Sequence, residues 1–438
     1  MDFNPFVRRR ESFLKHLRGA AAIIPAATTV THHADCEYPF RQDSDFWYLT
    51  GFDEPDAIAL FLSHRPQGEQ YVLFILPSAP DLEVWNGPRA GIDLAIKTFG
   101  ADLAHSLEEL PKYLPLYLQG AKEIAFRVGK HKKIERHVLK EISTQVDKVA
   151  RNGESPFPLV SPSLLLHQMR LRKDKHEIDS LRKAAQISAE AHELVREFAR
   201  PNMNERQLQG FIENHFLQNG ARGPAYGSII AGGDNACILH YISNNRIINN
   251  GDLVLIDAGC SMMDYYNADI TRTFPINGSF TGEQKAIYEV VLAAQEAAIG
   301  CVLPGNNTED IHMKAVKVLV QGLLEIGLLK GSLDSIIEQK GYSHLYMHRT
   351  GHWLGLDVHD VGAYRLGEYP LSLEEGMVLT VEPGIYISDR LPVPEGQPSI
   401  EDRWKGIGIR IEDDILVQPG SHEIITAKAK KSLEEMEF

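Results

Sequence analysis

The sequence predicts two consecutive domains that each mix α-helices with β-strands, which is the α/β (α+β) fold class. Residues 1–164 alternate short apolar runs with turns and amphipathic segments, a spacing typical of an α/β domain. Residues 165–438 show the order helix, helix, strand, strand twice, although residue identities do not repeat visibly. Between them, residues 151–163 hold three prolines, one glycine and three serines, which disfavour helices and central strands. We therefore expect a linker there, with domains 1–164 and 165–438.

Five strands are expected in the first domain, because apolar, β-branched and aromatic residues cluster between turn residues: 45–52, 57–63, 70–77, 83–87 and 123–129. In the second domain, helical periodicity predicts four long helices at 174–199, 204–219, 283–302 and 308–329. Aliphatic runs predict strands at 252–260, 269–276, 377–387 and 406–417.

Composition narrows the classes of partner. The chain has 438 residues, of which 43% are hydrophobic and 24% charged, enough for a sizeable core. The net charge of -14 repels phosphate backbones and anionic bilayers, so we expect neither nucleic acid nor membrane as a partner. No signal-peptide pattern and no apolar run of about eighteen residues is evident. Four widely spaced cysteines without a CxxC pair predict reduced thiols, and we expect a soluble cytoplasmic protein.

Acidic residues end several of the aliphatic strands. Asp257 closes LVLID, Glu382 follows VLTV and Asp269 opens DITRTF. A buried carboxylate costs several kcal/mol unless it is paired or binds a metal. For one such acid alone, the alternative that it caps a turn in water is favoured.

The segment GIGIRIEDD adds a fourth acid. Strand alternation places Ile407, Ile409 and Ile411 on one face, with Gly408, Arg410 and Glu412 on the other. Arg410 and Glu412 could form an ion pair, and Arg272 could pair with Asp269. Each acid alone has such an explanation, but four of them, two from each half of the repeat, indicate a shared positive centre.

Histidines supply a further indication. His344, His348, His352 and His359 lie within sixteen residues, close to Trp353 and other apolar residues. An exposed cluster is one interpretation, but a buried neutral imidazole is usually hydrogen-bonded or bound to a metal. His240, in ILHYI, would by itself be interpreted as a core histidine.

Four carboxylates and one imidazole suit manganese, magnesium, cobalt, iron or a zinc pair, and disfavour a thiolate site. So many acids fit two ions about 3.5–4 Å apart, which can activate water and polarise a carbonyl. The sequence lacks the motifs of competing chemistries: GxxxxGK[ST], HExxH, GxSxG, and GxGxxG after a strand. Hydrolysis is therefore the predicted reaction class.

Across nearly its whole length the sequence resembles the Xaa-Pro aminopeptidase (aminopeptidase P) family of proline-specific pita-bread metallopeptidases. EYPFRQDSDFWYLTGFDEP resembles the family's amino-terminal domain. NACILHY, LVLIDAGC, DITRTFP, HWLGLDVHD, VEPGIY and GIGIRIEDD follow in the family's order. The resemblance implies a pita-bread catalytic domain with a pseudo-twofold repeat at 165–438.

The resemblance also implies a ligand set for two divalent ions, with manganese first and cobalt, zinc or iron as other candidates. Its members are Asp257, Asp269, His352, Glu382 and Glu412, of which Asp269 and Glu412 would bridge both ions. One departure concerns the two aspartates, which have eleven residues between them instead of the usual ten. The DITRTFP context identifies Asp269 as the ligand, since Asp264 lacks it, and a turn accommodates the extra residue.

The implied reaction is hydrolysis of the bond between an N-terminal residue and a following proline by a hydroxide bridging the ions. Glu382 would move the proton, and His240 and His359 would stabilise the oxyanion or hold the peptide. His348 and Arg410 would handle protons and position the site. Tyr226, Asp35 and Trp85 match substrate positions, although Asp35 and Trp85 could equally be turn and core residues. The resemblance implies a homodimer or homotetramer.

Two alternatives remain open. A prolidase, which cleaves Xaa-Pro dipeptides, shares all five ligands, and Trp353 and the amino-terminal motif favour the aminopeptidase over it. A non-enzymatic pita-bread binding module is disfavoured, since such modules lose ligands. Methionine aminopeptidase is disfavoured because its catalytic unit needs no leading domain. A metal-free creatinase-like hydrolase is disfavoured because such relatives lack the carboxylate set.

Overall fold

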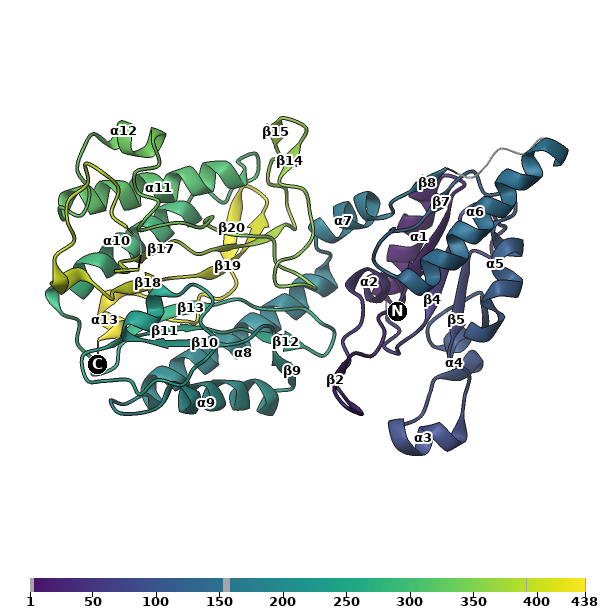
Figure 1. The fold of residues 1–438 in the computed structure, drawn as a ribbon, viewed down its shortest axis with the longest axis horizontal. Helices are drawn as coiled ribbons and strands as arrows, with labels where there is room; N and C mark the ends of the chain where they lie inside the picture. The colour runs from purple at the N-terminus through teal and green to yellow at the C-terminus, as the bar shows by residue number, and fades with distance from the viewer. Residues whose placement is uncertain (1–3, 153–157, 391, 438) are drawn as a thin grey trace. The chain divides into compact units, whose positions relative to one another are not determined.

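The computed structural model describes residues 4–152, 158–390 and 392–437. The chain divides into two compact units, Met1–Met169 and Arg170–Phe438 (Figure 1). Residues 153–157 of the expected linker lie outside the described residues. The linker and the domain boundary at 164 and 165 therefore stay predictions.

The first unit is built on a six-stranded mixed sheet. Neighbouring strands are β6 (Leu103–Ser106), β5 (Tyr71–Ile75), β4 (Ile58–Leu62), β1 (Ala21–Pro25), β7 (Ile124–Ala125) and β8 (Leu159–Val160). β4 pairs antiparallel with both β1 and β5, and the other pairs are parallel. A separate hairpin joins β2 (Thr31–His33) to β3 (Cys36–Glu37).

Helices bury both faces of this sheet. The helices are α1 (Pro5–Leu17), α2 (Ser44–Thr50), α3 (Pro80–Asn86), α4 (Gly91–Lys97), η1 (Leu107–Glu109), α5 (Leu110–Leu118) and α6 (Lys132–Asn152). A further helix, α7 (Ser163–Leu171), includes Met169 and Arg170, between which the two units divide. On one face Leu60 belongs to the same core cluster as Leu114 of α5. On the other, Phe61 meets Phe13 of α1 edge-on, with ring centroids 5.4 Å apart. Strand alternation thus explains why β4 is buried throughout.

Two strand predictions in this unit are wrong. Residues 45–52 form α2, because the Asp43 side chain accepts hydrogen bonds from the backbone N–H groups of Asp45 and Phe46 and Gly51 ends the helix at φ 64°. Residues 83–87 belong largely to α3, which begins at Pro80. An N-cap aspartate and a first-turn proline are strong helix starts that outweigh the β-propensity of aromatic residues. The strands at 57–63, 70–77 and 123–129 are confirmed, the last as a short one.

The second unit contains four long helices, α8 (Lys175–Phe198), α9 (Glu205–Gln218), α10 (Gly282–Ile299) and α11 (Thr308–Glu325), as predicted. All four begin with a capping box, at Asp174, Asn204, Thr281 and Asn307. α8 packs on α9, and α10 packs on α11. In Figure 1 the first pair lies beside β9–β13 and the second beside β16–β19. Shorter helices are η2 (Gly233–Cys237), α12 (Leu333–Glu338), η3 (Asp402–Trp404) and α13 (Leu433–Met436).

The strands form small sheets. One three-stranded sheet has the order β10 (Ile229–Gly232), β11 (Leu253–Asp257), β13 (Thr271–Pro275), and the other has the order β16 (Val378–Val381), β19 (Asp413–Gln418), β20 (Ser421–Ile424). The two-stranded pairs are β9 (Ala221–Pro224) with β12 (Cys260–Met262), β17 (Gly384–Tyr386) with β18 (Gly408–Arg410), and β14 (Arg365–Leu366) with β15 (Tyr369–Pro370). The repeated helix, helix, strand, strand order is thereby confirmed.

Three of the four predicted strands in this unit are interrupted. Residues 252–260 break between β11 and β12, residues 377–387 between β16 and β17, and residues 406–417 between β18 and β19. Each break holds an acid at or directly beside a strand end: Asp257 ends β11, Glu382 follows β16 and Glu412 precedes β19. The unit's core, which includes Ile407, Ile409 and Ile411, packs these strands against the long helices.

Within the described ranges, no helix combines the length and apolar character needed to cross a membrane.

Candidate metal centre

The strand breaks bring together side chains from both halves of the repeat. Ligand atoms of Asp269, His352 and Glu412 all lie within 4.8 Å of one another. His352 connects this group to Glu382, with Nε2 3.6 Å from a carboxylate oxygen of Glu382. Tyr226 connects it to Asp257, because its hydroxyl contacts carboxylate oxygens of both Asp257 and Asp269. The structure therefore gathers the five predicted ligands.

The Tyr226 hydroxyl shows how crowded with negative charge this cluster is. It lies 2.6 Å from an oxygen of Asp257 and also contacts Asp269. A hydroxyl carries only one proton, so it can donate to only one of two ionised carboxylates. The second contact needs either a protonated carboxyl group or a nearby cation.

His352 is oriented as a metal ligand would be. Its Nδ1 lies 3.0 Å from the carbonyl oxygen of Trp353, and since a carbonyl only accepts, Nδ1 carries a hydrogen. Nε2 then points at Asp269, 3.4 Å away, and at Glu382. Burial lowers the pKa of His352, but the Asp269 and Glu382 carboxylates raise it more strongly, to about 9. A cation among these oxygens would replace that proton and leave Nε2 as its ligand.

The carboxylates lack enough positive charge around them. Burial raises the pKa of Asp257 even though Arg410 opposes the shift. Burial raises the pKa of Glu382 to about 7. Burial, reinforced by Asp269, Glu382 and Asp257, raises the pKa of Glu412 well above its usual value. A cluster of hard oxygen donors that is short of positive charge fits one or more divalent cations.

Two glycines allow the strands that carry the ligands to approach each other. A Cβ atom on Gly259 would lie 1.8 Å from the backbone oxygen of Ala268, next to Asp269. A Cβ atom on Gly351, next to His352, would lie 1.9 Å from the backbone oxygen of Thr380. Backbone atoms cannot move aside as a flexible side chain can, so both positions need glycine.

Arg410 and His348 form a hydrogen-bonded group around Tyr386. Arg410 donates to Asp257 over 2.6 Å, to the Tyr386 hydroxyl over 3.1 Å and to Thr271 Oγ1 over 3.0 Å. His348 Nε2 lies 2.9 Å from the same Tyr386 hydroxyl, and its Nδ1 lies 3.8 Å from Glu382. Burial lowers the pKa of His348 to about 4, so this imidazole is neutral near pH 7.

His359 and His240 lie at the rim of the site. The His359 ring meets the His352 ring edge-on, with centroids 4.2 Å apart. Partial burial of the His359 ring, helped by His352 and more weakly by His240, lowers the pKa of this residue. Both residues are exposed, so the interpretation of His240 as a core histidine is wrong: its apolar neighbours in sequence lie in an irregular segment without strand or helix.

Asp35 and Trp85 belong to the first unit. Asp35 lies in the exposed turn between β2 and β3. Trp85, on α3, is 84% exposed, so the alternative that it is a core residue is wrong. Short helices with no buried side chain, such as α3, leave their aromatic residues on the surface. The substrate-binding roles of both residues stay predictions.

Two ion pairs that the local sequence offered as alternative explanations are wrong, because both arginines pair with other acids. Arg410 pairs with Asp257 instead of Glu412, and Arg272 pairs with Asp413 instead of Asp269. Strand alternation explains the second change. Arg272 and Asp269 are three residues apart, so their side chains point to opposite sides of β13 and the residues directly before it. Asp264 hydrogen-bonds Ser180, outside the cluster, while the turn at residues 263–265 carries the strained Tyr265, at φ 71°.

Sequence reasoning missed the hydroxyl groups that support the ligands. Thr271 Oγ1 donates to Glu412 over 2.7 Å, and Thr380 Oγ1 lies 3.4 Å from Glu382. The backbone N–H of Glu382 donates to the Thr350 carbonyl over 2.8 Å. The spacing of Thr271 from Asp269 was an available signal, because residues two apart on a strand face the same side.

The repeated helix-helix-strand-strand arrangement, with carboxylates and one imidazole gathered in a single cluster, defines the class: metal-dependent peptidases of the pita-bread fold. Residues 179–419 match Metallopeptidase family M24, and residues 6–125 match the Aminopeptidase P, N-terminal domain. The Xaa-Pro aminopeptidase of Haemophilus influenzae is 42% identical over 98% of this chain and 95% of its own. The Xaa-Pro aminopeptidase of Escherichia coli is 41% identical over 99% and 96%.

Solved structures agree. Aminopeptidase PepP of Pseudomonas aeruginosa superposes with a TM-score of 0.93 at 42% identity, covering 98% of this chain and 96% of that one. Aminopeptidase P of Escherichia coli, solved with the inhibitor Pro-Leu, gives 0.92 at 40% identity, covering 99% and 96%. The chain belongs to metallopeptidase family M24, among the Xaa-Pro aminopeptidases, and is an enzyme.

Proposed function

We propose that this enzyme releases the N-terminal residue of peptides whose second residue is proline, and that two divalent metal ions held by Asp257, Asp269, His352, Glu382 and Glu412 support the hydrolysis. The observation that carries the proposal is the gathering of these side chains in one buried cluster that is short of positive charge. Asp269 and Glu412, whose ligand atoms lie within 4.8 Å of each other and of a ring nitrogen of His352, are the proposed bridging ligands.

The bound ions would polarise the scissile carbonyl and make a water molecule acidic near neutral pH. We infer manganese as the natural metal, with cobalt, zinc or iron as substitutes, because carboxylate oxygens and one imidazole accept all of them. Tyr226, whose hydroxyl contacts Asp257 and Asp269, orients these two carboxylates toward the shared site.

Glu382 is the proposed proton carrier of the reaction. One of its oxygens faces His352 and the other faces His348. Its backbone N–H donates to the Thr350 carbonyl, and Thr380 Oγ1 lies 3.4 Å from one carboxylate oxygen, so both the backbone and the side chain have defined contacts. This carboxylate can accept a proton from the attacking water and return it to the leaving proline nitrogen.

The remaining side chains hold the substrate and the proton network. His240 and His359, at the rim, are proposed to donate hydrogen bonds to the developing oxyanion or the peptide; one such donor is worth about 3–4 kcal/mol. His348 and Arg410 meet at the Tyr386 hydroxyl and position Glu382 and Asp257. Asp35 and Trp85 of the first unit are proposed substrate contacts. We further propose a cytoplasmic homodimer or homotetramer.

The decisive experiment compares products from Xaa-Pro-Yaa tripeptides and Xaa-Pro dipeptides by mass spectrometry, using chain reloaded with manganese. Release of Xaa from the tripeptides supports the aminopeptidase. Turnover of dipeptides alone would indicate a prolidase, which the match to the aminopeptidase P amino-terminal domain disfavours. Metal-loaded chain that cleaves neither substrate would favour a binding module.

A further inference from the structure

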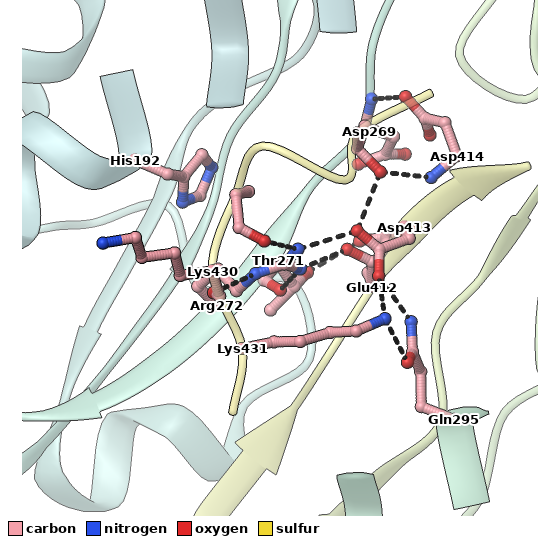
Figure 2. A network of polar contacts seen from close by, with 12 residues as sticks. His192, Asp269, Thr271, Arg272, Gln295, Glu412, Asp413, Asp414, Lys430 and Lys431 are labelled. Carbon is pink, nitrogen blue, oxygen red and sulfur yellow. Dashed lines mark hydrogen bonds and ion pairs between the residues drawn. The ribbon is translucent and has the colours of Figure 1, made fainter. Parts of the chain in front are cut away.

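A second polar network adjoins the metal centre and reaches the C-terminal segment (Figure 2). It contains Arg272 of β13, Asp413 of β19, Gln295 of α10, Thr426 and Lys431, together with the backbone carbonyls of Ala429 and Lys430. We call it the Arg272–Asp413 network. None of its side chains belongs to the proposed ligands, yet it touches the backbone that carries them.

Arg272 uses every N–H of its guanidinium group. Nε donates to Lys430 O over 2.8 Å. Nη1 donates to Thr271 O over 2.9 Å and to Glu412 O over 2.6 Å. Nη2 donates to Asp413 over 2.7 Å and to Ala429 O over 2.7 Å. A planar group with all five donors engaged fixes the segments it contacts at one separation.

Asp413 is equally saturated. One oxygen accepts from Arg272 and, over 2.7 Å, from Thr426 Oγ1. The other accepts from Gln295 Nε2 over 2.8 Å and from Lys431 Nζ over 2.7 Å. Lys431 also donates to Gln295 over 2.8 Å, so one lysine near the C-terminus joins α10 to β19.

Strand alternation connects this network to the metal centre. Glu412 and Asp413 are adjacent, so their side chains point to opposite sides, as do those of Thr271 and Arg272. Thr271 and Glu412 face each other on the metal side, where the Thr271 hydroxyl donates to the Glu412 carboxylate. Nη1 of Arg272 binds the carbonyls of these same two residues from behind.

The segment that follows Glu412 also holds Asp269. The backbone N–H of Asp269 donates to the side chain of Asp414 over 3.1 Å, and the backbone N–H of Asp414 in turn donates to Thr426 Oγ1 over 3.1 Å. Both proposed bridging ligands are therefore attached to backbone that the Arg272–Asp413 network immobilises.

We propose that the Arg272–Asp413 network is a positioning device that sets the spacing of Asp269 and Glu412, and that Lys431 makes the C-terminal segment part of it. This inference rests on the proposed metal ligation. Arg272, Asp413 and Lys431 are positioning residues, since they act through the ligand-bearing backbone.

The test compares Lys431→Met with a matched control, Lys430→Met, in the full-length chain. The Lys430 side chain is exposed and its backbone oxygen, which the variant keeps, makes the contact to Arg272. Manganese alone is titrated into metal-free protein by calorimetry, and the electron paramagnetic resonance spectrum of the loaded pair is recorded. Lys431→Met should weaken manganese binding about 10–100-fold, as loss of outer-shell support generally does.

In the same variant, kcat at saturating manganese should fall with KM for the peptide little changed, and the spectrum of the manganese pair should change. Lys430→Met should match the native protein in all measurements, and Lys431→Arg, which keeps the charge, should restore binding. Arg272→Lys, with three donors in place of a planar fork, should weaken binding further.

Native manganese affinity and spectrum in Lys431→Met, with only a lower melting temperature of the metal-free protein, would mean a merely structural role and overturn the proposal. Failure of the proposed function can be told apart from failure of this proposal. If the native chain binds manganese but cleaves no peptide, the proposed function is wrong, while the manganese affinities of the variants can still be compared.

Discussion

Two adjacent buried carboxylates, Glu412 and Asp413, have opposite environments. Asp413 accepts hydrogen bonds from Arg272 and Lys431, and although burial raises its pKa, these two cations lower it to about 2. Glu412 faces Asp269 and accepts a hydrogen bond from the neutral Thr271 hydroxyl; burial and the like charges of the neighbouring carboxylates raise its pKa well above the usual value, although Arg410 opposes the shift. One residue is compensated by the protein itself, whereas the other is left for an external cation.

The same contrast extends beyond this pair. Asp360, next to His359, is neutralised by Arg170 and Lys173, with shortest contacts of 2.5 and 3.0 Å. Burial raises the pKa of Asp360, but these cations outweigh it and the pKa is lowered. Asp413 and Asp360, which each contact two protein cations, are thus structural, whereas in the cluster of proposed ligands Arg410 pairs with Asp257 and yet the pKa values of Asp257 and Glu412 stay raised.

The largest effect should come from removing an uncompensated acid. Glu412→Gln relieves repulsion, so the metal-free protein should be at least as stable as the native one. The loss of a ligand should lower kcat/KM about 100–1000-fold, since a metal ion supplies several kcal/mol to the transition state. Peptide hydrolysis, metal content by mass spectrometry and thermal melting check this. A variant with native activity and two bound ions would refute the ligand assignment.

Removing the neighbouring acid Asp413, which is paired with protein cations, should have the opposite effect on the stability of the metal-free protein. Asp413→Asn leaves Arg272 and Lys431 buried or partly buried without their anion, at a cost of about 3–5 kcal/mol in unfolding free energy. Urea titration of metal-free and metal-loaded protein should show this loss in both forms. Unchanged urea midpoints would contradict the proposed division between the two acids.

The pH dependence of stability sharpens the comparison. The pKa of Asp413, about 2, lies below the unfolded value of about 3.9, so its contribution is present above pH 4 and is lost as the pH falls toward 2. The pKa of Glu382, about 7, lies above the unfolded value of about 4.3, so metal-free protein loses stability as the pH rises from 4 to 7.

We therefore expect metal-free protein to be most stable near pH 4–5, with on the order of 2–3 kcal/mol lost by pH 7 through Glu382. Added manganese should restore stability above pH 6, because its ligands must be deprotonated. Melting curves across this pH range measure the effect. Glu382→Gln should make the decline smaller but not remove it, because the raised pKa values of Asp257 and Glu412 act in the same direction; an unchanged decline would assign the effect to groups other than Glu382.

The smallest effect should come from Tyr226→Phe. The hydroxyl contacts two carboxylates in the metal-free protein, so its removal should cost about 1–2 kcal/mol of unfolding free energy there. Bound ions neutralise the same oxygens, so the cost should be smaller in the loaded protein. Equal losses in both forms would mean that the hydroxyl plays no part in charge compensation.

Local patterns predicted much of this molecule. The four long helices have both periodicity and capping residues, and Asp257 and Glu382 follow aliphatic runs whose burial the sequence makes plain. In these cases propensity, capping and burial all favour the same structure. At residues 45–52 they conflict, and the Asp43 cap prevails over aromatic β-propensity.

The partners of the acids could not be predicted in this way. Alternation in GIGIRIEDD predicts that the side chains of Asp413 and Glu412 point to opposite sides. It does not predict that Lys431 and Gln295 lie next to Asp413 and donate hydrogen bonds to it. Likewise, Arg410 reaches Asp257 across strands that are far apart in sequence. Which acids are compensated depends on tertiary contacts, and the family motifs supplied the ligand set where local reasoning left alternatives.

The two glycines beside the ligands have a consequence for redesign of this enzyme. At Gly259 and Gly351 even a methyl group would occupy space already filled by a neighbouring carbonyl, so alanine there would drive two ligand-bearing segments apart. Libraries that vary substrate preference should therefore keep glycine at both positions.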